Sequence, residues 1–184
     1  MALTYSKGMA KGTKAPDFNL PGTDGRNYTL ESFREAKALI VLFTCNHCPY
    51  ARACEDRFIA LQNDYATKGV RIVAINSNDA ATYPDDSFAN MKIRTKEKSY
   101  PFPYLCDETQ KVARAYDAAC TPDIFLFDAA RKLVYNGRLD DNWQEPTKVT
   151  KQELREAIDC TLAGKAVPFE PKPSMGCNIK WKKL

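Results

Sequence analysis

The sequence predicts an α/β protein whose central sheet mixes parallel and antiparallel strands and carries helices on both faces. Two apolar runs, residues 38–43 and 70–75, are separated by a segment whose apolar side chains recur at helical spacing. A strand, a helix and a second strand in this order predict a parallel pair joined by a crossover helix. Residues 124–127 and 133–135 are two extended runs joined by a short turn, which indicates an antiparallel pair.

The N-terminal part is expected to form a hairpin that precedes this sheet. Residues 15–20 alternate apolar and polar side chains, residues 21–25 supply turn-forming types, and residues 27–30 resume an extended pattern. The first buried strand, residues 38–43, follows, and it is apolar throughout.

The long helix after residue 43 is expected to start near Asn46. Pro49 fits its first turn, where a backbone N–H has no partner inside the helix. Lys68 and Gly69 supply a cation and a C-cap at its end, and residues 70–75 then form the second buried strand.

Three further helices are expected after residue 83. Pro84 and the two acids after it open the first. Asp107 with Gln110 resembles a capping box for a short second helix, and Thr150 with Glu153 resembles one for the last helix.

The chain is expected to form a single domain over residues 1–184, with a core at about residues 13–163 and a C-terminal tail at 165–184. Hydrophobic residues make up 44% of it, which is typical of a globular protein. The net charge of +4 is modest, and its lysines and arginines are mixed with acids, so we expect no nucleic-acid partner. The basic residues 180–183 are expected to be a solvated terminus.

No run of the sequence approaches the roughly 18 apolar residues that a membrane-spanning helix needs. Residues 1–10 lack the sustained apolar core of a signal peptide, so we expect a cytoplasmic location and no membrane span. The seven cysteines are an odd number. In a reducing compartment most of them should be thiols, with one special pair cycling.

The segment Thr44-Cys45-Asn46-His47-Cys48-Pro49 carries the most information about function. Two thiols spaced C-x-x-C at a junction of strand and helix form the arrangement that makes and breaks disulfides. The first turn of a helix has unpaired N–H groups and partial positive charge, which lowers the pKa of a thiol placed there. We therefore expect Cys45, as the exposed N-terminal cysteine, to be the nucleophile, and Cys48, further into the helix, to be the more buried resolving thiol.

Four segments of the chain resemble one known family. They are residues 15–20 (Ala-Pro-Asp-Phe-Asn-Leu), 45–49, 103–107 (Pro-Tyr-Leu-Cys-Asp) and 121–128 (Thr-Pro-Asp-Ile-Phe-Leu-Phe-Asp). In them the chain resembles the alkyl hydroperoxide reductase/thiol-specific antioxidant (redoxin) family, in its thioredoxin-like thiol-disulfide oxidoreductase branch. The resemblance implies a thioredoxin-like fold of three α/β/α layers with an N-terminal hairpin extension. It also implies a cis Pro122 beside the cysteines and a Thr121 backbone that pairs with an extended substrate segment.

The expected reaction is thiol-disulfide exchange. The Cys45 thiolate attacks a protein disulfide, and Cys48 resolves the mixed disulfide, which leaves a Cys45–Cys48 disulfide for an external thiol reductant to reduce. The pair is then its own redox group, and no other cofactor is expected. Asn46 and His47 set its potential, because a histidine here places positive charge near the Cys45 thiolate. We expect a potential between those of thioredoxin, about −270 mV, and DsbA, about −120 mV.

Two features depart from the family pattern. Thr44 stands where such motifs usually have tryptophan, and residues 38–43 contain no buried acid to take the proton of Cys48. Water or Asp107 is expected to accept the proton of Cys48 instead.

Five cysteines lie outside the motif. Cys120 comes two residues before Pro122, where either packing or a third thiol that accepts the disulfide fits its position. Cys177 lies in a tail that resembles the tail of this family branch. It is expected to be either a helper thiol that reaches the active site or a cysteine packed in the tail, and the two alternatives fit equally well. The other three are expected to pack in the core: Cys54, Cys106 and Cys160.

Two other functions are weighed against the reductase. A peroxiredoxin-like peroxidase needs Pro-x-x-x-Thr/Ser-x-x-Cys, but no proline stands at the matching offset before Cys45 or Cys48. Copper binding would use soft thiolates and His47, yet copper-delivery relatives of this fold space their cysteines one residue further apart and add a distant histidine. His47 is the single histidine of the chain, and no second C-x-x-C is present, so we expect no metal.

Overall fold

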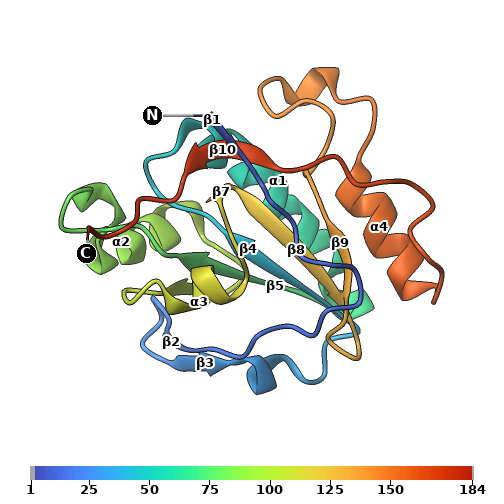
Figure 1. Cartoon of the computed structure of the whole chain (residues 1–184), viewed down its shortest axis with the longest axis horizontal. Helices are drawn as coiled ribbons and strands as arrows, with labels where there is room; N and C mark the ends of the chain where they lie inside the picture. The colour runs from blue at the N-terminus through green and yellow to red at the C-terminus, as the bar shows by residue number, and fades with distance from the viewer. Residues whose placement is uncertain (1–2, 184) are drawn as a thin grey trace.

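A five-stranded sheet crosses the middle of the molecule in the computed structural model, which describes residues 3–183 (Figure 1). Its strand order is β6-β5-β4-β8-β9. The strands are β4 (Ala38–Phe43), β5 (Val70–Asn76), β6 (Tyr104–Cys106), β8 (Asp123–Asp128) and β9 (Leu133–Asn136). The neighbours β4, β5 and β6 run parallel, whereas β8 is antiparallel to β4 and to β9. The predicted mixed sheet, including both predicted strand pairs, is confirmed.

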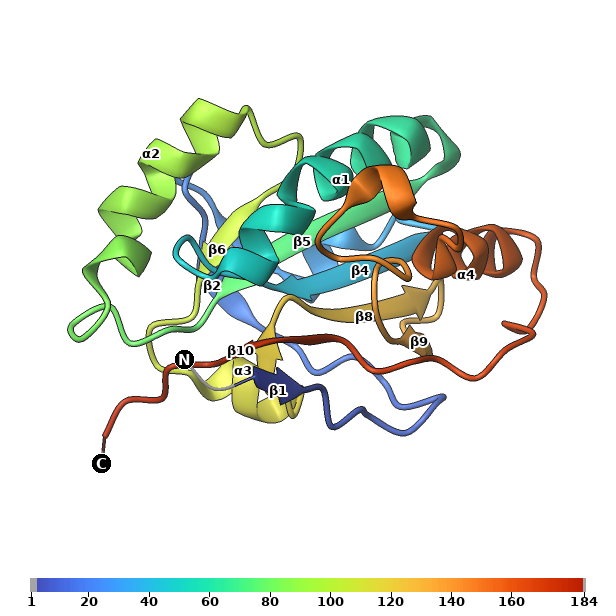
Figure 2. The same ribbon diagram turned by 90° about the horizontal axis from the view of Figure 1, so that it is seen from above.

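Helices cover both faces of this sheet, as Figure 2 shows. The helices are α1 (Pro49–Tyr65), α2 (Phe88–Lys98), α3 (Lys111–Ala115) and α4 (Glu153–Leu162). Side chains of α1, α2 and α4 pack into one apolar cluster, and those of α3 pack into the other, together with the predicted hairpin of β2 (Asn19–Pro21) and β3 (Asn27–Thr29). The three layers match the predicted α/β/α architecture.

The central strand β4 is buried on both faces, which explains why every one of its residues is apolar. Leu39 and Val41 pack into the cluster on the α3 face, while Ile40 and Leu42 pack into the cluster on the α1 face. Because successive side chains of a strand point to opposite faces, a strand covered on both sides needs apolar residues at every position.

The start of α1 differs from the prediction. The helix begins at Pro49 rather than near Asn46, and Cys48 is its N-cap, with an extended backbone of φ −72° and ψ 121°. A residue that precedes proline is disfavoured in the helical region, which keeps Cys48 out of the helix. Residues 45–48 therefore form a loop between β4 and α1.

Two other predicted helix starts are also wrong. Pro84–Asp86 form a short 3₁₀ turn, and α2 begins only at Phe88, where the Ser87 hydroxyl accepts a hydrogen bond from the Asn90 amide. The Thr150 hydroxyl donates to Asp141, and α4 begins at Glu153 with Gln152 as N-cap. The Thr150 hydroxyl, which looked like a cap in sequence, thus has its partner at Asp141.

A second, three-stranded sheet joins strands from near both ends of the chain, and no sequence pattern predicted it. It contains β1 (Leu3–Tyr5), β7 (Cys120–Thr121) and β10 (Met175–Asn178), in the order β1-β10-β7, with both pairs antiparallel. β1 and β10 lie next to each other at the top of Figure 1. No helix within residues 3–183 has both the length and the apolar content needed to span a bilayer.

Candidate active site

Cys45 and Cys48 lie in the loop that follows β4, beside the Thr121–Pro122 peptide bond, which is cis as the resemblance implied. Cys48 is fully buried, and Cys45 is only 5% exposed. The expectation of an exposed Cys45 is therefore wrong. Cys45 packs in one apolar cluster with Cys48, Ala51 and Cys177, which comes from the C-terminal strand β10.

Thr121 contacts both sulfurs of the pair. Its hydroxyl lies 3.4 Å from Cys45 Sγ. Its carbonyl oxygen lies 3.1 Å from Cys48 Sγ and accepts a hydrogen bond from the Cys48 thiol in the dithiol form. The residue before Pro122 thus contacts both cysteines.

A hydrogen bond between the two sulfurs makes this pair acidic. It lowers the pKa of Cys48 to about 4 and raises the pKa of Cys45 well above its ordinary value. The backbone N–H of Ala51, in the first turn of α1, also lowers the pKa of Cys48. The sequence placed the lowered pKa on Cys45. The structure places it on Cys48, chiefly because Cys48 accepts the hydrogen bond from Cys45, and also because Cys48 is the N-cap of α1 and faces the Ala51 amide.

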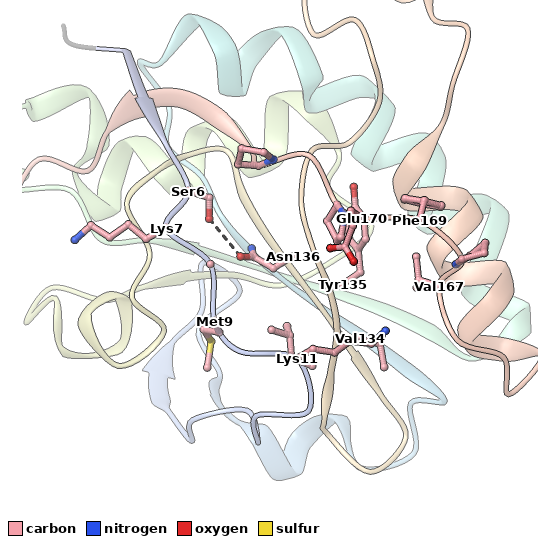
Figure 3. Close-up of a pocket in the computed structure, with 15 residues that line it drawn as sticks. Ser6, Lys7, Met9, Lys11, Val134, Tyr135, Asn136, Val167, Phe169 and Glu170 are labelled. Carbon is pink, nitrogen blue, oxygen red and sulfur yellow. Dashed lines mark hydrogen bonds between the residues drawn. The ribbon is translucent and has the colours of Figure 1, made fainter.

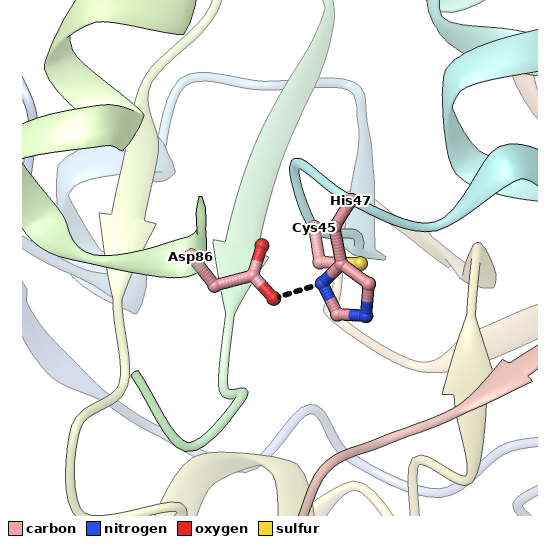
Figure 4. Close-up of side chains that lie close together, drawn as sticks. All are labelled: Cys45, His47 and Asp86. Carbon is pink, nitrogen blue, oxygen red and sulfur yellow. Dashed lines mark hydrogen bonds and ion pairs between the residues drawn. The ribbon is translucent and has the colours of Figure 1, made fainter. Parts of the chain in front are cut away.

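His47 and Asp86 form a buried ion pair at the mouth of this site. His47 Nδ1 lies 2.5 Å from Asp86 Oδ2, as Figure 4 shows. Asp86 also accepts hydrogen bonds from the Asn46 amide (2.7 Å) and from Asn78 Nδ2 (2.8 Å). The Asp86 carboxylate raises the pKa of His47. Burial raises the pKa of Asp86, but the hydrogen bonds from His47, Asn78 and Asn46 outweigh burial, so this pKa lies below its usual value.

The ion pair changes what His47 can do for the thiols. The charge of a protonated His47 is balanced by Asp86, and the negative charge of Asp86 itself raises the pKa of Cys45. The imidazole stacks on Tyr83, with ring centroids 5.3 Å apart. Lys180 Nζ lies 5.6 Å from the Tyr83 ring and lowers the pKa of His47 by charge repulsion. His47 thus belongs to a charged network rather than acting as an isolated cation.

Cys45, His47 and Asp86 also offer ligand atoms that lie within 4.8 Å of one another. A metal ion held by all three would need His47 Nδ1 or His47 Nε2 as a ligand. Nδ1 already shares a proton with Asp86, and a cation there would displace that hydrogen bond. The ion pair accounts for the short distance between His47 Nδ1 and Asp86 without a metal ion, whereas Nε2 is buried with no hydrogen-bond partner among residues 3–183.

Thr44 and Asn46 are the remaining supporting residues, and their hydrogen bonds hold the loop that carries the two cysteines. Thr44 is buried, and its amide donates to Ile75 O (2.9 Å), which joins the end of β4 to β5. Asn46 Nδ2 donates to Asp85 O (2.8 Å), and the Tyr104 hydroxyl donates to Asn46 Oδ1 (3.1 Å). These contacts hold the loop between Cys45 and Cys48.

Asp107 does not fit the role that the sequence suggested for it. Its carboxylate accepts hydrogen bonds from the Ser77 hydroxyl and from the Ala113 amide, both at 2.9 Å, so it caps α3. The carboxylate that acts on Cys45 is Asp86. Sequence reasoning missed Asp86, although Asp86 follows β5 and the loops after adjacent parallel strands meet at one edge of a sheet.

The five remaining cysteines differ in their surroundings. Cys177 pairs with Thr121 across β7 and β10, is 2% exposed, and forms a hydrogen bond with Cys48. Burial raises the pKa of Cys177 to about 12. The Cys120 thiol donates to Pro122 O (3.5 Å) and to Ser174 O (3.8 Å), and burial raises its pKa. Cys54 is in the core as predicted. Cys106 is partly exposed but packs against the same cluster, and Cys160 is partly exposed.

A separate hollow of about 620 Å³ lies away from the cysteines (Figure 3). It is bordered by the N-terminal segment, β9 and residues 167–173. The hydroxyl of Ser6, in the N-terminal segment, donates a hydrogen bond to Asn136 Oδ1 of β9, with 3.4 Å between the two oxygens. Cys45, Cys48 and their partners do not line it, so the hollow is not a substrate pocket of the thiol pair.

Comparison with known proteins gives relatives of two kinds. The thiol-disulfide oxidoreductase ResA of Geobacillus thermodenitrificans is 28% identical over 134 residues, which is 71% of this chain and 70% of ResA. The chloroplastic peroxiredoxin Q of rice (Oryza sativa subsp. japonica) is 25% identical over 111 residues, or 59% of this chain. The chain spans about half the length, 46%, of that peroxiredoxin.

Solved structures support the same fold. A conserved protein from Geobacillus kaustophilus that is described as uncharacterized is 48% identical, with a TM-score of 0.94, over 100% of this chain and 98% of that one. The thioredoxin domain of a thiol-disulfide oxidoreductase from Bacteroides vulgatus is 20% identical, with a TM-score of 0.60, over 70% of this chain and 89% of that one. The second likeness establishes the thioredoxin-like fold alone.

The family profile described as Redoxin matches residues 10–156, which include the hairpin, the cysteine pair, the cis-proline turn and the start of α4. The match covers well over half of the chain. This chain therefore belongs to the Redoxin family.

Proposed function

We propose that the protein is a thiol-disulfide oxidoreductase that works through the Cys45–Cys48 pair. The observation that carries this proposal is the contact between the two sulfurs at the helix N-terminus, which lowers the pKa of Cys48 to about 4. A pair of thiols that already share a hydrogen bond needs little movement to form a disulfide, and a stabilised thiolate is the reactive form in exchange. Membership of the Redoxin family and the similarity to ResA support the same reaction class.

Burial decides which sulfur meets the substrate. Cys48 is fully buried, so Cys45 is the sulfur that a partner reaches, although only 5% of it is exposed. The Cys45 thiol passes its proton to the Cys48 thiolate and attacks one sulfur of a protein disulfide. A mixed disulfide forms, and the other substrate sulfur leaves as a thiolate.

The resolving step returns the pair to its oxidised form. The departing substrate thiolate takes the proton from Cys48, and the Cys48 thiolate then attacks Cys45 Sγ. The mixed disulfide breaks, the second substrate thiolate leaves, and a Cys45–Cys48 disulfide remains. Two electrons have passed from the pair to the substrate, and an external thiol reductant restores them. No further cofactor enters this cycle. A cytoplasmic location stays a prediction.

Trapping tests this assignment. In Cys48→Ser the mixed disulfide cannot be resolved, so incubation with insulin should leave insulin chains covalently bound to Cys45, and dithiothreitol should release them. Cys45→Ser is the matched control. It should trap no insulin, because the thiol of the pair that remains, Cys48, is buried. Equal trapping by the two variants, or none by either, would reject the proposal.

A peroxidase is the second candidate, because peroxiredoxin Q is among the relatives and the Thr121 hydroxyl lies 3.4 Å from Cys45 Sγ. Peroxiredoxin-like chemistry needs a hydroxyl near the reacting thiolate. Here, however, the pKa of Cys45 is raised, so little of this thiol is ionised at neutral pH. Stopped-flow mixing of the reduced protein with hydrogen peroxide should give the slow second-order rate of an ordinary thiol. A rate at least about a thousandfold faster would favour the peroxidase.

A further inference from the structure

The C-terminal strand β10 occupies the edge of the cis-proline turn. Cys177 lies opposite Thr121, and Asn178 lies opposite Cys120, in an antiparallel pair. The Ile179 amide donates to Ala119 O (3.1 Å) and extends this pairing. The family resemblance implied that the Thr121 backbone would pair with an extended substrate segment. In this structure the protein's own C-terminal tail pairs with Thr121 in place of a substrate segment.

The tail is fixed on both sides of the contact. On one side the Ser174 hydroxyl donates to Gly137 O (2.7 Å). On the other side the Lys180 amide donates to Asn78 Oδ1 (2.8 Å), and Lys180 O accepts from Gln110 Nε2 (2.8 Å). The outer edge of β10 is covered by β1. Strand β10 is therefore held in place as part of the active site.

Gly176 shows how closely the tail approaches the turn. A Cβ atom at this position would lie 1.9 Å from Thr121 O and 2.7 Å from Thr121 C. Real Cβ atoms do not approach the backbone so closely, so a side chain here would displace β10 from Thr121. The sequence has the one residue type that permits the contact.

The approach brings a third thiol onto the reactive pair. Cys177 shares one buried cluster with Cys45 and Cys48, and it is hydrogen-bonded to Cys48. Cys120 is also buried close by, but its thiol donates to two backbone carbonyls, Pro122 O and Ser174 O. Cys177 is thus the tail thiol that contacts a sulfur of the pair.

We propose that Cys177 is a third redox residue, and that the disulfide of the active site moves between Cys45–Cys48 and Cys48–Cys177. This inference rests on the proposed function, because it starts from an oxidised pair. Cys177 attacks Cys48 Sγ as a thiolate, the Cys45–Cys48 bond breaks, and the Cys48–Cys177 bond forms. Cys45 leaves as a thiolate and takes the proton that Cys177 has lost. The number of electrons on the three sulfurs does not change, so no oxidant or reductant is consumed.

The exchange has a structural consequence. In the Cys48–Cys177 form β10 is bonded covalently to the loop before α1, and the Thr121 edge is closed to a substrate strand. Cys45 is then a single thiol without a resolving partner. The tail thus acts as an internal substrate segment that holds the disulfide when no other protein does.

Disulfide mapping of the full-length protein tests this proposal. The reduced protein is oxidised with one equivalent of diamide, quenched with acid, alkylated and digested with trypsin under non-reducing conditions. Cleavage after Lys37 and Arg52 places Cys45 and Cys48 on one peptide, 38–52, and cleavage after Lys165 and Lys180 places Cys177 on another, 166–180. The proposal predicts both the internal disulfide of peptide 38–52 and its cross-link to peptide 166–180.

Variants separate the three sulfurs. In Cys45→Ser the Cys48–Cys177 cross-link should become the main disulfide. In Cys48→Ser, where only Cys45 could join the two peptides, the cross-link between peptides 38–52 and 166–180 should fall at least tenfold. Gly176→Ala, which displaces β10, should also reduce the cross-link at least tenfold, whereas Cys160→Ser on α4 should leave it unchanged. Circular dichroism of each variant checks that the fold is retained.

The outcomes distinguish this inference from the proposed function. If peptide 38–52 forms its internal disulfide but no variant cross-links to peptide 166–180, the inference is overturned and the oxidoreductase stands. Cross-links of peptide 38–52 to the Cys120 peptide, 115–131, at a comparable level would also overturn it, because contact with Cys177 would then have no special role. If neither disulfide forms, the proposed function fails as well.

Discussion

At the level of single residues, the pair of His47 and Asp86 controls the charge beside Cys45. Removing the imidazole would leave the buried Asp86 carboxylate uncompensated, and its charge would raise the pKa of Cys45 further. His47→Ala is therefore expected to lower the redox potential of the pair. The variant loses the partner that balances Asp86 rather than an isolated cation.

The titration of His47 is the direct test of this ion pair. Because the chain has one histidine, a single imidazole signal is expected in the NMR spectrum. The hydrogen bond to Asp86 raises the pKa of His47 above 6.5. In Asp86→Asn the titration midpoint should move down to 6.5 or below, since burial and Lys180 both lower the pKa of His47. An unchanged midpoint in the variant would show that Asp86 does not hold the imidazolium.

The ion pair also predicts how stability depends on pH. The raised pKa of His47 gives stability that is complete below pH 6.5 and is lost as the pH rises through the folded-state pKa. The lowered pKa of Asp86 gives stability that is present above pH 3.8 and is lost as the pH falls through the folded-state pKa. The ion pair should therefore stabilise the fold most at about pH 4 to 6.5.

Chemical denaturation at two pH values measures this effect. The difference in unfolding free energy between the wild type and Asp86→Asn should be larger at pH 5 than at pH 8.5. A decrease of about 1.5 kcal/mol is expected, the lower end for a hydrogen bond to a charged group. Part of the difference should persist at pH 8.5, because Asn46 and Asn78 still donate to Asp86. Equal differences at both pH values would contradict the ion pair.

At the level of elements, the chain after β9 is held to α1 by one arginine. Arg57 Nη1 lies 2.5 Å from Asp140 Oδ2 and also donates to Asn142 O, while Nη2 donates to Trp143 O. Arg138 is paired with Glu153 at 2.7 Å, at the start of α4. Arg138 and Asp140, the charged residues that follow β9, thus anchor this part of the chain to α4 and α1.

Arg57→Ala should therefore destabilise the protein. The side chains of Arg57 and Asp140 are 18% and 5% exposed, so the variant leaves a buried carboxylate without its partner. A loss of about 3 kcal/mol in unfolding free energy is expected. Arg155→Ala is the matched control, because Arg155 pairs with Asp64 at the surface, and its loss should be below about 1 kcal/mol. Similar losses in the two variants would show that burial of the Arg57 pair is unimportant.

The predicted elements show what local sequence patterns reveal. The run 38–43 matches β4 residue for residue, because a strand buried on both faces is apolar at every position. Helix starts were less predictable, since the choice of cap depends on partners that are distant in sequence, such as Asp141 for Thr150. β10 carried no pattern at all. Its Met-Gly-Cys-Asn sequence lacks strand formers, and only its pairing with Thr121 makes it a strand.

At the level of the whole molecule, β1 from the N-terminal part and β10 from the C-terminal part lie side by side next to the cis-proline turn. β1 covers β10, and β10 covers the cis-proline turn that contacts Cys45 and Cys48. The cysteine pair could be predicted from its motif, because the chemistry requires two thiols close in sequence, and Pro122 from the resemblance to the family. Asp86 and Cys177 could not be assigned, because tertiary structure alone brings them to the pair.

The redox state of the Cys45–Cys48 pair is the central claim, and its equilibrium potential tests it most directly. The full-length protein is equilibrated in glutathione buffers, alkylated and digested, and the mass of peptide 38–52 gives the fraction oxidised. A thiolate stabilised on Cys48 favours the dithiol, so the midpoint should lie above the value of about −270 mV for thioredoxin. A midpoint at or below about −270 mV, or a peptide that keeps two alkylated thiols in every buffer, would contradict the account.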